Sequence, residues 1–348
     1  MPSLPSFDAA TNKCENPHVV ILGAGASIAA CPSGDKNGKI LPSLQNLETV
    51  VGIEHITAEI ESSVGTLGAG FEEKYSNLIT IGSHKQEIQE INDKIHYYFS
   101  QLELPDSLTV YDYLILGLRE KDAIFTFNWD PFLLQALLRC SGVTKPPNIF
   151  FLHGNVSVGV CQGCKVKGNA GQSCGRCSSP LTNTDLLFPV KQKNYNASGF
   201  LINEWNALRD YLKYAYFVTI FGYRAPFTDV EARQIFIDSF GINSSREFAE
   251  VEIIDIRERK DIEDSWDQFV FEQHYSVWDN ITGSQIYKHF RRSCDAFAMA
   301  SLQCHPVPEF APDGISSVSD LREFARKLYA EENSGDKLWK DHKNPFGP

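Results

Sequence analysis

Several features of membrane, secreted and nucleic-acid-binding proteins are missing from this sequence. It has no stretch of about 18 apolar residues, so a membrane span is not expected. The first residues do not combine positive charge with an apolar run, so we expect no signal peptide and a cytoplasmic location. Lys and Arg number 32 against 44 Asp and Glu, and they form no dense cluster. A broad nucleic-acid-binding face is therefore not predicted, because phosphate binding needs clustered basic residues.

What is present is typical of a globular protein. The 348 residues are 43% hydrophobic and 22% charged, enough for one large core or two modest domains. The nine cysteines are an odd number, and four of them fall in two close pairs. In a reducing compartment this pattern indicates one metal site plus free thiols rather than a disulfide framework.

Short apolar runs that end in glycine or polar residues predict buried strands at residues 18–25, 123–128, 148–153, 217–221 and 251–256. The segments between these runs show helical periodicity, at residues 86–102, 131–139 and 203–216. Because apolar strands alternate with helices, the sequence predicts an α/β protein with a Rossmann-like parallel sheet and helices on both faces.

The chain also divides by composition. We expect one catalytic domain over residues 18–302, with a helical insertion at about 44–119 and a small module at about 155–183. The module is rich in Gly, Ser, Lys and Cys and can supply little core. Residues 303–348 form a polar C-terminal extension with a charged helix near 320–331.

A glycine-rich turn follows the first strand. Gly23, Ala24, Gly25 and Ser27 form a sequence whose glycines let a backbone approach a pyrophosphate, next to a helix N-terminus. The alternative is an ordinary strand-to-helix turn. The third glycine of the dinucleotide motif is absent, since Ile28 occupies its place, and no acidic residue ends a second strand. A standard dehydrogenase is therefore not expected.

Polar residues also follow two later strands. Asn128 and Asp130 come after the second, where Asn128 could position a water or a ribose hydroxyl and Asp130 could accept a bond from a carboxamide. The alternative is an Asx turn capping the next helix. His153 and Gly154 follow the third strand, and His153 is either a general base or a structural hydrogen-bonding residue.

Four cysteines have the spacing of a zinc module. The pairs are separated by nine residues, and each has two residues between its cysteines. Four thiolates suit tetrahedral Zn²⁺, and metal binding would supply the folding energy that this core-poor stretch lacks. The alternative is a set of redox pairs. We expect a structural zinc bound by Cys161, Cys164, Cys174 and Cys177.

Taken in order, these elements resemble the sirtuin family, which carries Gly-Ala-Gly-x-Ser, Thr-x-Asn-x-Asp, His-Gly and then a four-cysteine zinc module. His153 precedes Cys161 by eight residues, about the family's spacing. Gly222 stands where sirtuins have Gly-Thr-Ser, and Asp255 lies near the family's adenosine-ribose residue. The resemblance covers residues 19–256.

The resemblance implies that NAD is bound as a substrate and zinc as a structural ion. Asn128 and His153 would be catalytic, with His153 accepting a proton from a ribose hydroxyl or from the attacking water. Asp130 would bind the nicotinamide carboxamide. The implied NAD-binding residues are Gly23, Ala24, Gly25, Ser27, Asn128, Asp130, Gly222 and Asp255.

The motifs also depart from those of sirtuin deacylases. Residues 30–35 lack the Gly-Ile-Pro-Asp-Phe-Arg sequence, and Phe127 replaces the expected glutamine. Residues 186–190 replace the segment that pairs with a substrate peptide, and Pro189 would remove an edge donor. Residues 222–229 are closer to a divergent bacterial branch that includes NAD hydrolases of anti-phage defence.

The sequence therefore favours hydrolysis of NAD to ADP-ribose and nicotinamide. Two alternatives stay open: an NAD-dependent lysine deacylase, and a sensor of NAD or ADP-ribose without turnover. The implied partners are NAD and either an activating protein or an acylated protein, and a homo-oligomer is compatible with the sequence.

Overall fold

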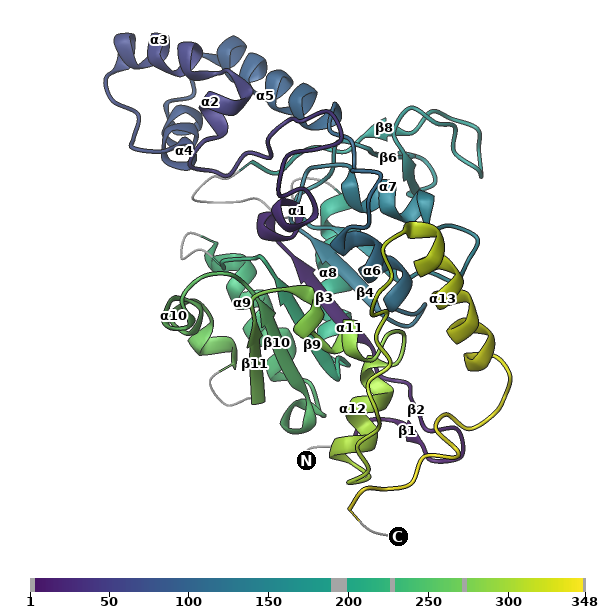
Figure 1. Ribbon diagram of the computed structural model, residues 1–348. Helices are drawn as coiled ribbons and strands as arrows, with labels where there is room; N and C mark the ends of the chain where they lie inside the picture. Colours follow the sequence, from purple (N-terminus) through teal and green to yellow (C-terminus); the bar gives the residue numbers. More distant parts are fainter. Residues whose placement is uncertain (1–3, 189–198, 226–228, 271–273, 347–348) are drawn as a thin grey trace.

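A six-stranded parallel sheet forms the centre of the protein (Figure 1). The computed structural model describes residues 4–188, 199–225, 229–270 and 274–346. The sheet order is β11-β10-β9-β3-β4-β5, so β3, the first strand of this sheet along the chain, lies in the middle. This confirms the predicted Rossmann-like parallel sheet. The strands are β3 (His18–Leu22), β4 (Ala123–Thr126), β5 (Asn148–Phe151), β9 (Phe217–Phe221), β10 (Glu250–Ile254) and β11 (His274–Trp278).

Helices cover both faces of the sheet, which explains why the central strands are apolar throughout. In β3, Val19 and Ile21 pack in one apolar cluster and Val20 and Leu22 in another. The first cluster is covered by α8 (Gly199–Leu212), α9 (Val230–Gly241) and α10 (Arg259–Val270). The second is covered by α1 (Ala24–Ala30), α6 (Val110–Gly117), α7 (Phe132–Arg139) and α13 (Val318–Glu332).

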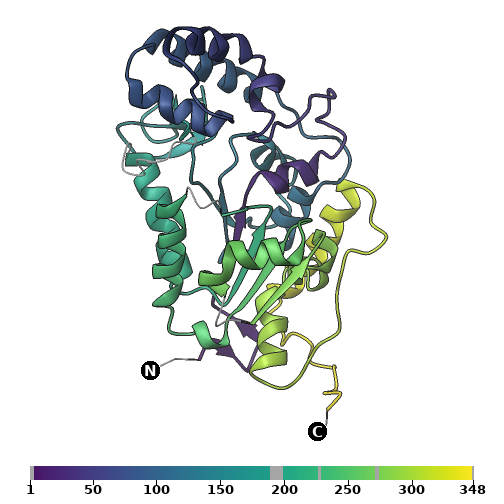
Figure 2. The ribbon, with the colours of Figure 1, turned by 90° about the vertical axis from the view of Figure 1, so that its left-hand side faces the viewer.

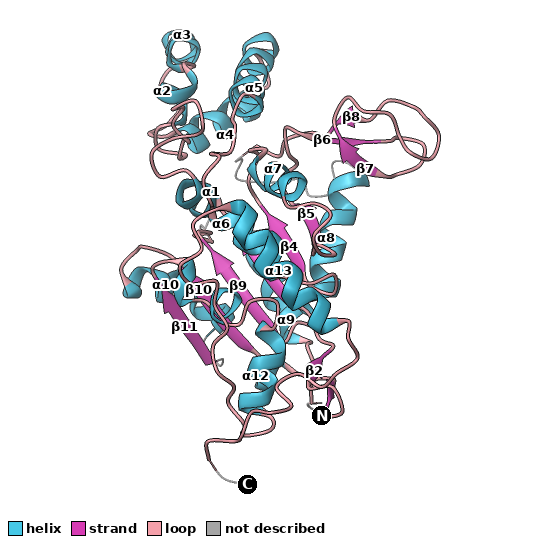
Figure 3. Cartoon of the chain, turned by 45° about the vertical axis from the view of Figure 1, so that its right-hand side comes forward, coloured by secondary structure: helices cyan, strands magenta, loops and turns pink. Residues whose placement is uncertain are grey.

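Four helices of the predicted insertion stand together beyond the carboxyl ends of the strands (Figures 1 and 3). Their buried residues, such as Ile60, Phe71 and Ile95, belong to the same apolar cluster as the sheet residues Val20 and Leu22. The insertion therefore extends the main core. These helices are α2 (Leu47–Val51), α3 (Glu54–Val64), α4 (Phe71–Ile81) and α5 (Lys85–Ser100).

The cysteine-containing module folds as a separate antiparallel sheet of order β7-β6-β8. Its strands are β6 (Val158–Val160), β7 (Lys167–Asn169) and β8 (Thr182–Asn183). The ammonium of Lys167 in β7 lies 2.9 Å from both carboxylate oxygens of the buried Glu204 in α8, and 2.7 Å from the carbonyl of Ile149 in β5. This ion pair attaches the small module to the edge of the large sheet.

The C-terminal residues pack against the main core. Leu321, Ala325 and Leu328 on one side of α13 are buried in the cluster that covers β3. The guanidinium of Arg291 donates to both carboxylate oxygens of Glu332, at 2.8 and 3.0 Å. The charged helix predicted near residues 320–331 is thus present, and it buries an apolar face.

The hairpin of β1 (Phe7–Asp8) and β2 (Lys13–Cys14) and the helix α12 (Ser293–Ser301) lie at the opposite end of the molecule from the insertion helices (Figures 1 and 2). The remaining elements are α11 (Gln285–Lys288) and the short 3-10 turns Arg246–Phe248 and Ile281–Gly283. No helix among the described residues is long and apolar enough to cross a membrane.

The elements differ from the predicted ones mainly at their ends. The second and third strands stop two residues earlier than the apolar runs suggested, at Thr126 and Phe151, because the chain turns there into the helix or module that follows. Strand β11 and helices α9, α10 and α12 were not predicted. The polar residues within β11, such as His274 and Ser276, hide its strand character, since an edge strand is only half covered.

Candidate functional site

The strand order has a switch point at the centre of the sheet. The chain proceeds from β3 to β4 and β5 on one side, and from β9 to β10 and β11 on the other. The order therefore reverses direction between β3 and β9. Ligands of open parallel sheets bind at such a switch point, outside the carboxyl ends of the strands.

Two glycine turns meet at this point. The N–H of Gly25 donates to the carbonyl of Gly222 at 3.0 Å, and the N–H of Gly23 donates to the carbonyl of Phe221 at 3.0 Å. A Cβ on Gly25 would lie 2.7 Å from the Cα of Gly222, which itself has φ +63°. The glycines are thus required for one backbone to approach another. Ala24 between them is exposed.

A buried polar cluster lies beside the glycine turn. We call Ser27, Tyr111, Asn128 and Asp130 the polar cluster. The Asn128 amide nitrogen donates to the Gly23 carbonyl at 2.9 Å, to the Ser27 hydroxyl at 2.9 Å and to the Tyr111 hydroxyl at 3.2 Å. The Ser27 hydroxyl donates to Asp130 Oδ2 at 2.6 Å. The structure therefore brings together Gly23, Ser27, Asn128 and Asp130, and their binding of NAD stays a prediction.

Asp130 makes the Asx turn that the sequence offered as one of two roles, and its contact with a carboxamide stays a prediction. Its Oδ1 accepts from the N–H of Phe132 at 3.2 Å, which is the Asx turn at the start of α7. Its Oδ2 faces Ser27. Burial raises the pKa of Asp130 to about 6, although the hydrogen bonds from Ser27 and Phe132 lower it.

His153 lies at the end of β5, next to β4, and packs among aromatic rings. Its ring meets the Phe127 ring edge-on with centroids 4.8 Å apart. Phe127 in turn stacks on Tyr223 at 4.1 Å with nearly parallel planes. These contacts group His153 with Phe127 and Tyr223, whereas Asn128 contacts the glycine turn. Phe127 and Asn128 are neighbours that point to opposite sides of the strand end.

Asn155 supports the loop that carries Asn128 and Asp130. Its buried side-chain amide donates to the carbonyl of Asp130 at 2.7 Å and to that of Asn128 at 3.4 Å. The N–H of Asn155 donates to the Thr184 hydroxyl at 3.2 Å, and that hydroxyl donates back to the Asn155 carbonyl at 3.1 Å. Thr184 directly follows β8, so this chain of bonds joins the cysteine module to the loop.

Asp255 follows β10 at the same edge of the sheet. Its carboxylate accepts from the backbone N–H of Arg257 at 3.0 Å and from the guanidinium of Arg257 at 3.0 and 2.9 Å. Asp255 therefore lies on the predicted edge, and its own neighbour neutralises its charge.

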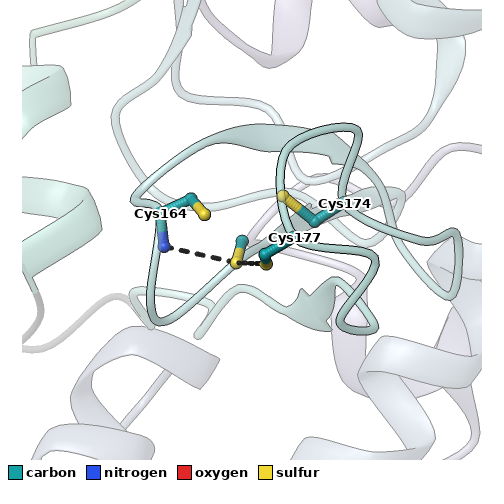
Figure 4. A group of neighbouring side chains, drawn as sticks. Cys164, Cys174 and Cys177 are labelled. Atoms are coloured by element: carbon teal, nitrogen blue, oxygen red, sulfur yellow. Dashed lines mark hydrogen bonds between the residues drawn. The ribbon is translucent and has the colours of Figure 1, made fainter.

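The four cysteines converge on one point (Figure 4). Their sulfur atoms all lie within 4.8 Å of one another, and those of Cys161 and Cys177 are 3.4 Å apart. Both pairs form the same turn: the N–H of Lys165 donates to the Cys161 carbonyl at 2.9 Å, and the N–H of Ser178 donates to the Cys174 carbonyl at 2.8 Å. The N–H of Cys164 points to the sulfur of Cys161 at 3.3 Å, and the N–H of Arg176 points to the sulfur of Cys174 at 3.4 Å.

The four sulfurs lie close enough to change one another's pKa values. Hydrogen bonds from Ser179 lower the pKa of the Cys177 thiol to about 6. The interaction with Cys177 raises the pKa of Cys164 to about 12. Four thiolates at this spacing repel one another, and a divalent cation removes that repulsion. The donor set and its geometry are therefore compatible with a structural zinc ion, as predicted from the spacing.

Two of the sequence motifs extend beyond the described residues. Pro189 and Val190 of the segment after the module lie outside them, as do residues 226–228 of the motif after β9. The described part of the first segment runs beside His153: the N–H of Leu187 donates to the His153 carbonyl at 2.9 Å.

The sequence reasoning missed Tyr111 and Asn155. Thr109 and Asp112 form a capping box, a signal for the start of α6, and Tyr111 lies in the first turn of that helix. Nothing in the sequence indicates that its hydroxyl reaches Ser27, which is 84 positions away. Asn155 is two residues after His153, and its adjacency to that motif was the available signal.

The chain is similar to several solved structures. One is a Sir2 in complex with the inhibitor EX-527, 2'-O-acetyl-ADP-ribose and deacetylated p53 peptide, at 16% identity and a TM-score of 0.37, covering 91% of this chain and 93% of that one. Another is a Sir2–p53 peptide–NAD+ structure, at 15% identity and a TM-score of 0.36, covering 91% of this chain and 92% of that one. A third is a Sir2 homologue–NAD complex, at 13% identity and a TM-score of 0.38, covering 82% of this chain and 90% of that one.

No family model matches the chain, and no curated protein matches it. The three solved structures are Sir2 structures, the family that the motif order resembles. Their identities and TM-scores are too low to carry a functional conclusion, so the function has to be argued from the chain's own residues.

Proposed function

We propose that the protein binds NAD at the switch point between β3 and β9 and breaks its bond to nicotinamide. One observation carries this proposal: Ser27, Asn128 and Asp130 form one buried hydrogen-bonded cluster beside the Gly23–Gly25 turn. A dinucleotide needs a close backbone approach for its phosphates and polar groups nearby for its ribose. Both features lie at the same edge of this sheet.

Each group at this edge has a distinct task in the proposed reaction. The turn at the exposed residue Ala24 offers the place for the phosphates, beside the close approach of Gly25 to Gly222. Asn128 keeps its side-chain oxygen for a ribose hydroxyl or a water, and Asp130 accepts from the carboxamide. His153, at the end of the neighbouring strand, accepts the proton of the ribose hydroxyl or of the attacking water.

The chemistry also needs a dry environment. Breaking the glycosidic bond develops positive charge on the ribose, which fixed oxygen dipoles stabilise best where water is excluded. Asn128 and Asp130 are 8% and 3% exposed. The rings of Phe127 and Tyr223 provide an apolar wall beside His153.

We favour water over an acyl-lysine as the acceptor. In a deacylase the segment after the zinc module pairs with the substrate peptide. Here the N–H of Leu187 is bonded to His153, and Phe188 packs between Tyr75 and Trp129 with ring centroids 5.0 and 5.2 Å away. Because these groups already have partners within the chain, the segment offers little to a peptide. The products are then ADP-ribose and nicotinamide.

The test is incubation of the purified protein with NAD alone, with nicotinamide measured over time. We expect release by the wild type. Release that requires an acylated peptide would instead establish the deacylase. Tight NAD binding without release under any condition would establish the sensor. If release needs a trigger, as anti-phage NAD hydrolases do, NAD should fall in infected cells expressing the protein.

Two substitutions test the catalytic residues. Asn128→Ala and His153→Ala are each expected to reduce nicotinamide release by about 100-fold or more, a typical loss for a positioned catalytic group. Both variants should keep the wild-type circular dichroism spectrum. Full activity of His153→Ala would remove His153 from the mechanism.

A further inference from the structure

The hydroxyl of Tyr111 lies in the middle of the polar cluster. It is 2.6 Å from the Ser27 hydroxyl and 3.2 Å from the Asn128 amide nitrogen. Tyr111 is 1% exposed and comes from α6, between the insertion and β4. It belongs to none of the sequence motifs, so its contacts with two of their residues require an explanation.

The donors and acceptors in the cluster allow one arrangement when Asp130 is ionised. Ser27 has a single hydroxyl hydrogen, and it points to the carboxylate of Asp130. The hydrogen between Tyr111 and Ser27 must therefore come from Tyr111. The Tyr111 oxygen then has lone pairs left to accept from Asn128.

This arrangement fixes the orientation of the Asn128 amide. Its two N–H hydrogens face three acceptors: the Gly23 carbonyl, the Ser27 hydroxyl and the Tyr111 hydroxyl. A flipped amide would place its oxygen 2.9 Å from the Gly23 carbonyl oxygen, and two acceptors repel each other at that distance. Within the described residues Asn128 Oδ1 accepts no hydrogen bond, so the oxygen stays available.

We propose that Tyr111 is a positioning residue that holds the Asn128 amide with its oxygen toward the ligand at the switch point. The proposal rests on the proposed function and deepens it, because it states which atom of Asn128 meets the ribose hydroxyl or the water. Tyr111 does not touch the ligand. It acts through Asn128.

Tyr113 offers a matched control on the same helix. It lies two residues after Tyr111, and its ring packs against Tyr287 with centroids 5.3 Å apart. Tyr111→Phe and Tyr113→Phe each remove one phenolic hydroxyl from α6. Only the first change removes a hydroxyl from the polar cluster.

In the kinetic test, nicotinamide release from NAD is measured for both variants. We expect Tyr111→Phe to reduce kcat about tenfold, the effect of one lost hydrogen bond, with KM within about twofold of the wild type. Tyr113→Phe should retain wild-type kinetics. In an Asn128→Ala background, Tyr111→Phe should cause no further loss, because its effect passes through Asn128. Equal kinetics of the two Phe variants, or additive losses, would overturn the proposal.

A second measurement does not depend on turnover. The side-chain NH₂ resonances of Asn128 are identified in a ¹H–¹⁵N spectrum by their loss in Asn128→Ala. We expect Tyr111→Phe to shift these resonances and to speed their exchange with water, and Tyr113→Phe to leave them unchanged. If the wild type releases no nicotinamide under any condition, with or without a trigger, the proposed function fails while this measurement still decides the role of Tyr111. Unshifted resonances in Tyr111→Phe would disprove the positioning role.

Discussion

At the scale of the residue, the site is a set of buried polar groups that complete one another's hydrogen bonds. Burying a hydroxyl, an amide or a carboxyl without a partner costs about 1–3 kcal/mol. Ser27, Tyr111 and Asn128 avoid this cost because each contacts the other two. The same bonds fix their orientation before any ligand arrives, which is the preorganisation that a polar reaction needs.

A second buried polar group gives a pH-dependent stability. Glu252 in β10 is 1% exposed and accepts from the Thr219 hydroxyl at 2.6 Å and from the N–H of Gln285 at 2.9 Å. Burial raises the pKa of Glu252 from 4.5 to about 7. Between these two values the folded protein keeps a proton that the unfolded chain has released. The free energy of unfolding therefore falls as the pH rises from about 4.5 to 7.

We predict that Glu252→Gln removes this contribution, because an amide keeps the shape and carries no charge. The effect is at most about 3 kcal/mol for a shift of this size. Urea unfolding at pH 5 and pH 7.5 measures it: the wild type should lose more stability between the two than the variant does. Equal losses in both proteins would show that Glu252 does not titrate in this range.

At the scale of the element, hydrogen bonds connect the cysteine module to the candidate site. Thr184, after β8, bonds Asn155, and Asn155 bonds the carbonyls of Asn128 and Asp130. Lys167 in β7 adds an ion pair with the buried Glu204. A module that is small and poor in core thereby contributes to the position of a loop outside it.

We predict that Thr184→Val weakens this connection. Loss of the hydroxyl leaves the N–H of Asn155 without its partner, which costs about 1–3 kcal/mol, while the Asn155 carbonyl still accepts from the N–H of Val158. The melting temperature and the rate of nicotinamide release should both fall. Thr182→Val is the matched control, because Thr182 lies in β8 two residues before Thr184, is exposed, and its hydroxyl bonds only within the module. Equal behaviour of the two variants would mean that the Thr184 bond is dispensable.

The cysteines supply the second prediction at this scale. Cys174→Ser should lower the zinc content and the solubility, because metal binding supplies folding energy to the module. Cys304→Ser is the control, since Cys304 is exposed and stands outside the group of four sulfurs. Metal analysis of both purified proteins decides the matter. A Cys174→Ser protein with a full complement of zinc would contradict the assignment of this ligand.

At the scale of the whole molecule, the N-terminal and C-terminal segments are hydrogen-bonded to each other. The N–H of Leu338 donates to the carbonyl of Thr11, and the ammonium of Lys13 lies 2.7 Å from the carbonyl of Glu332. Helix α13 also adds Leu321 and Leu328 to the core that covers β3. The C-terminal extension is therefore part of the structure that holds the central strand in place.

We predict that Leu321→Ala destabilises the protein by about 2–5 kcal/mol, because it leaves a cavity in that core. Lys327→Ala on the exposed side of α13 should change stability by less than about 0.5 kcal/mol. Denaturant unfolding of the two variants measures the difference. A small effect of Leu321→Ala would show that α13 is only loosely attached.

The sequence by itself determined the class of fold, the central strands and the zinc-binding spacing. Apolar runs such as residues 18–25 report burial on both faces locally, and the two cysteine turns are built from residues two or three positions apart. Local patterns of this kind need no knowledge of the rest of the chain. The same holds for Asn128 and Asp130, whose place after a strand set them at the carboxyl edge.

Only the tertiary structure decided how these parts meet. Tyr111 reaches Ser27 because α6 packs beside α1, and Gly25 needs to be glycine because the Gly222 turn comes within contact of it. The edge strand β11, half covered, has no apolar run to reveal it. Contacts between residues a hundred positions apart depend on the packing of helices against the sheet, and that packing is not written in any short stretch of sequence.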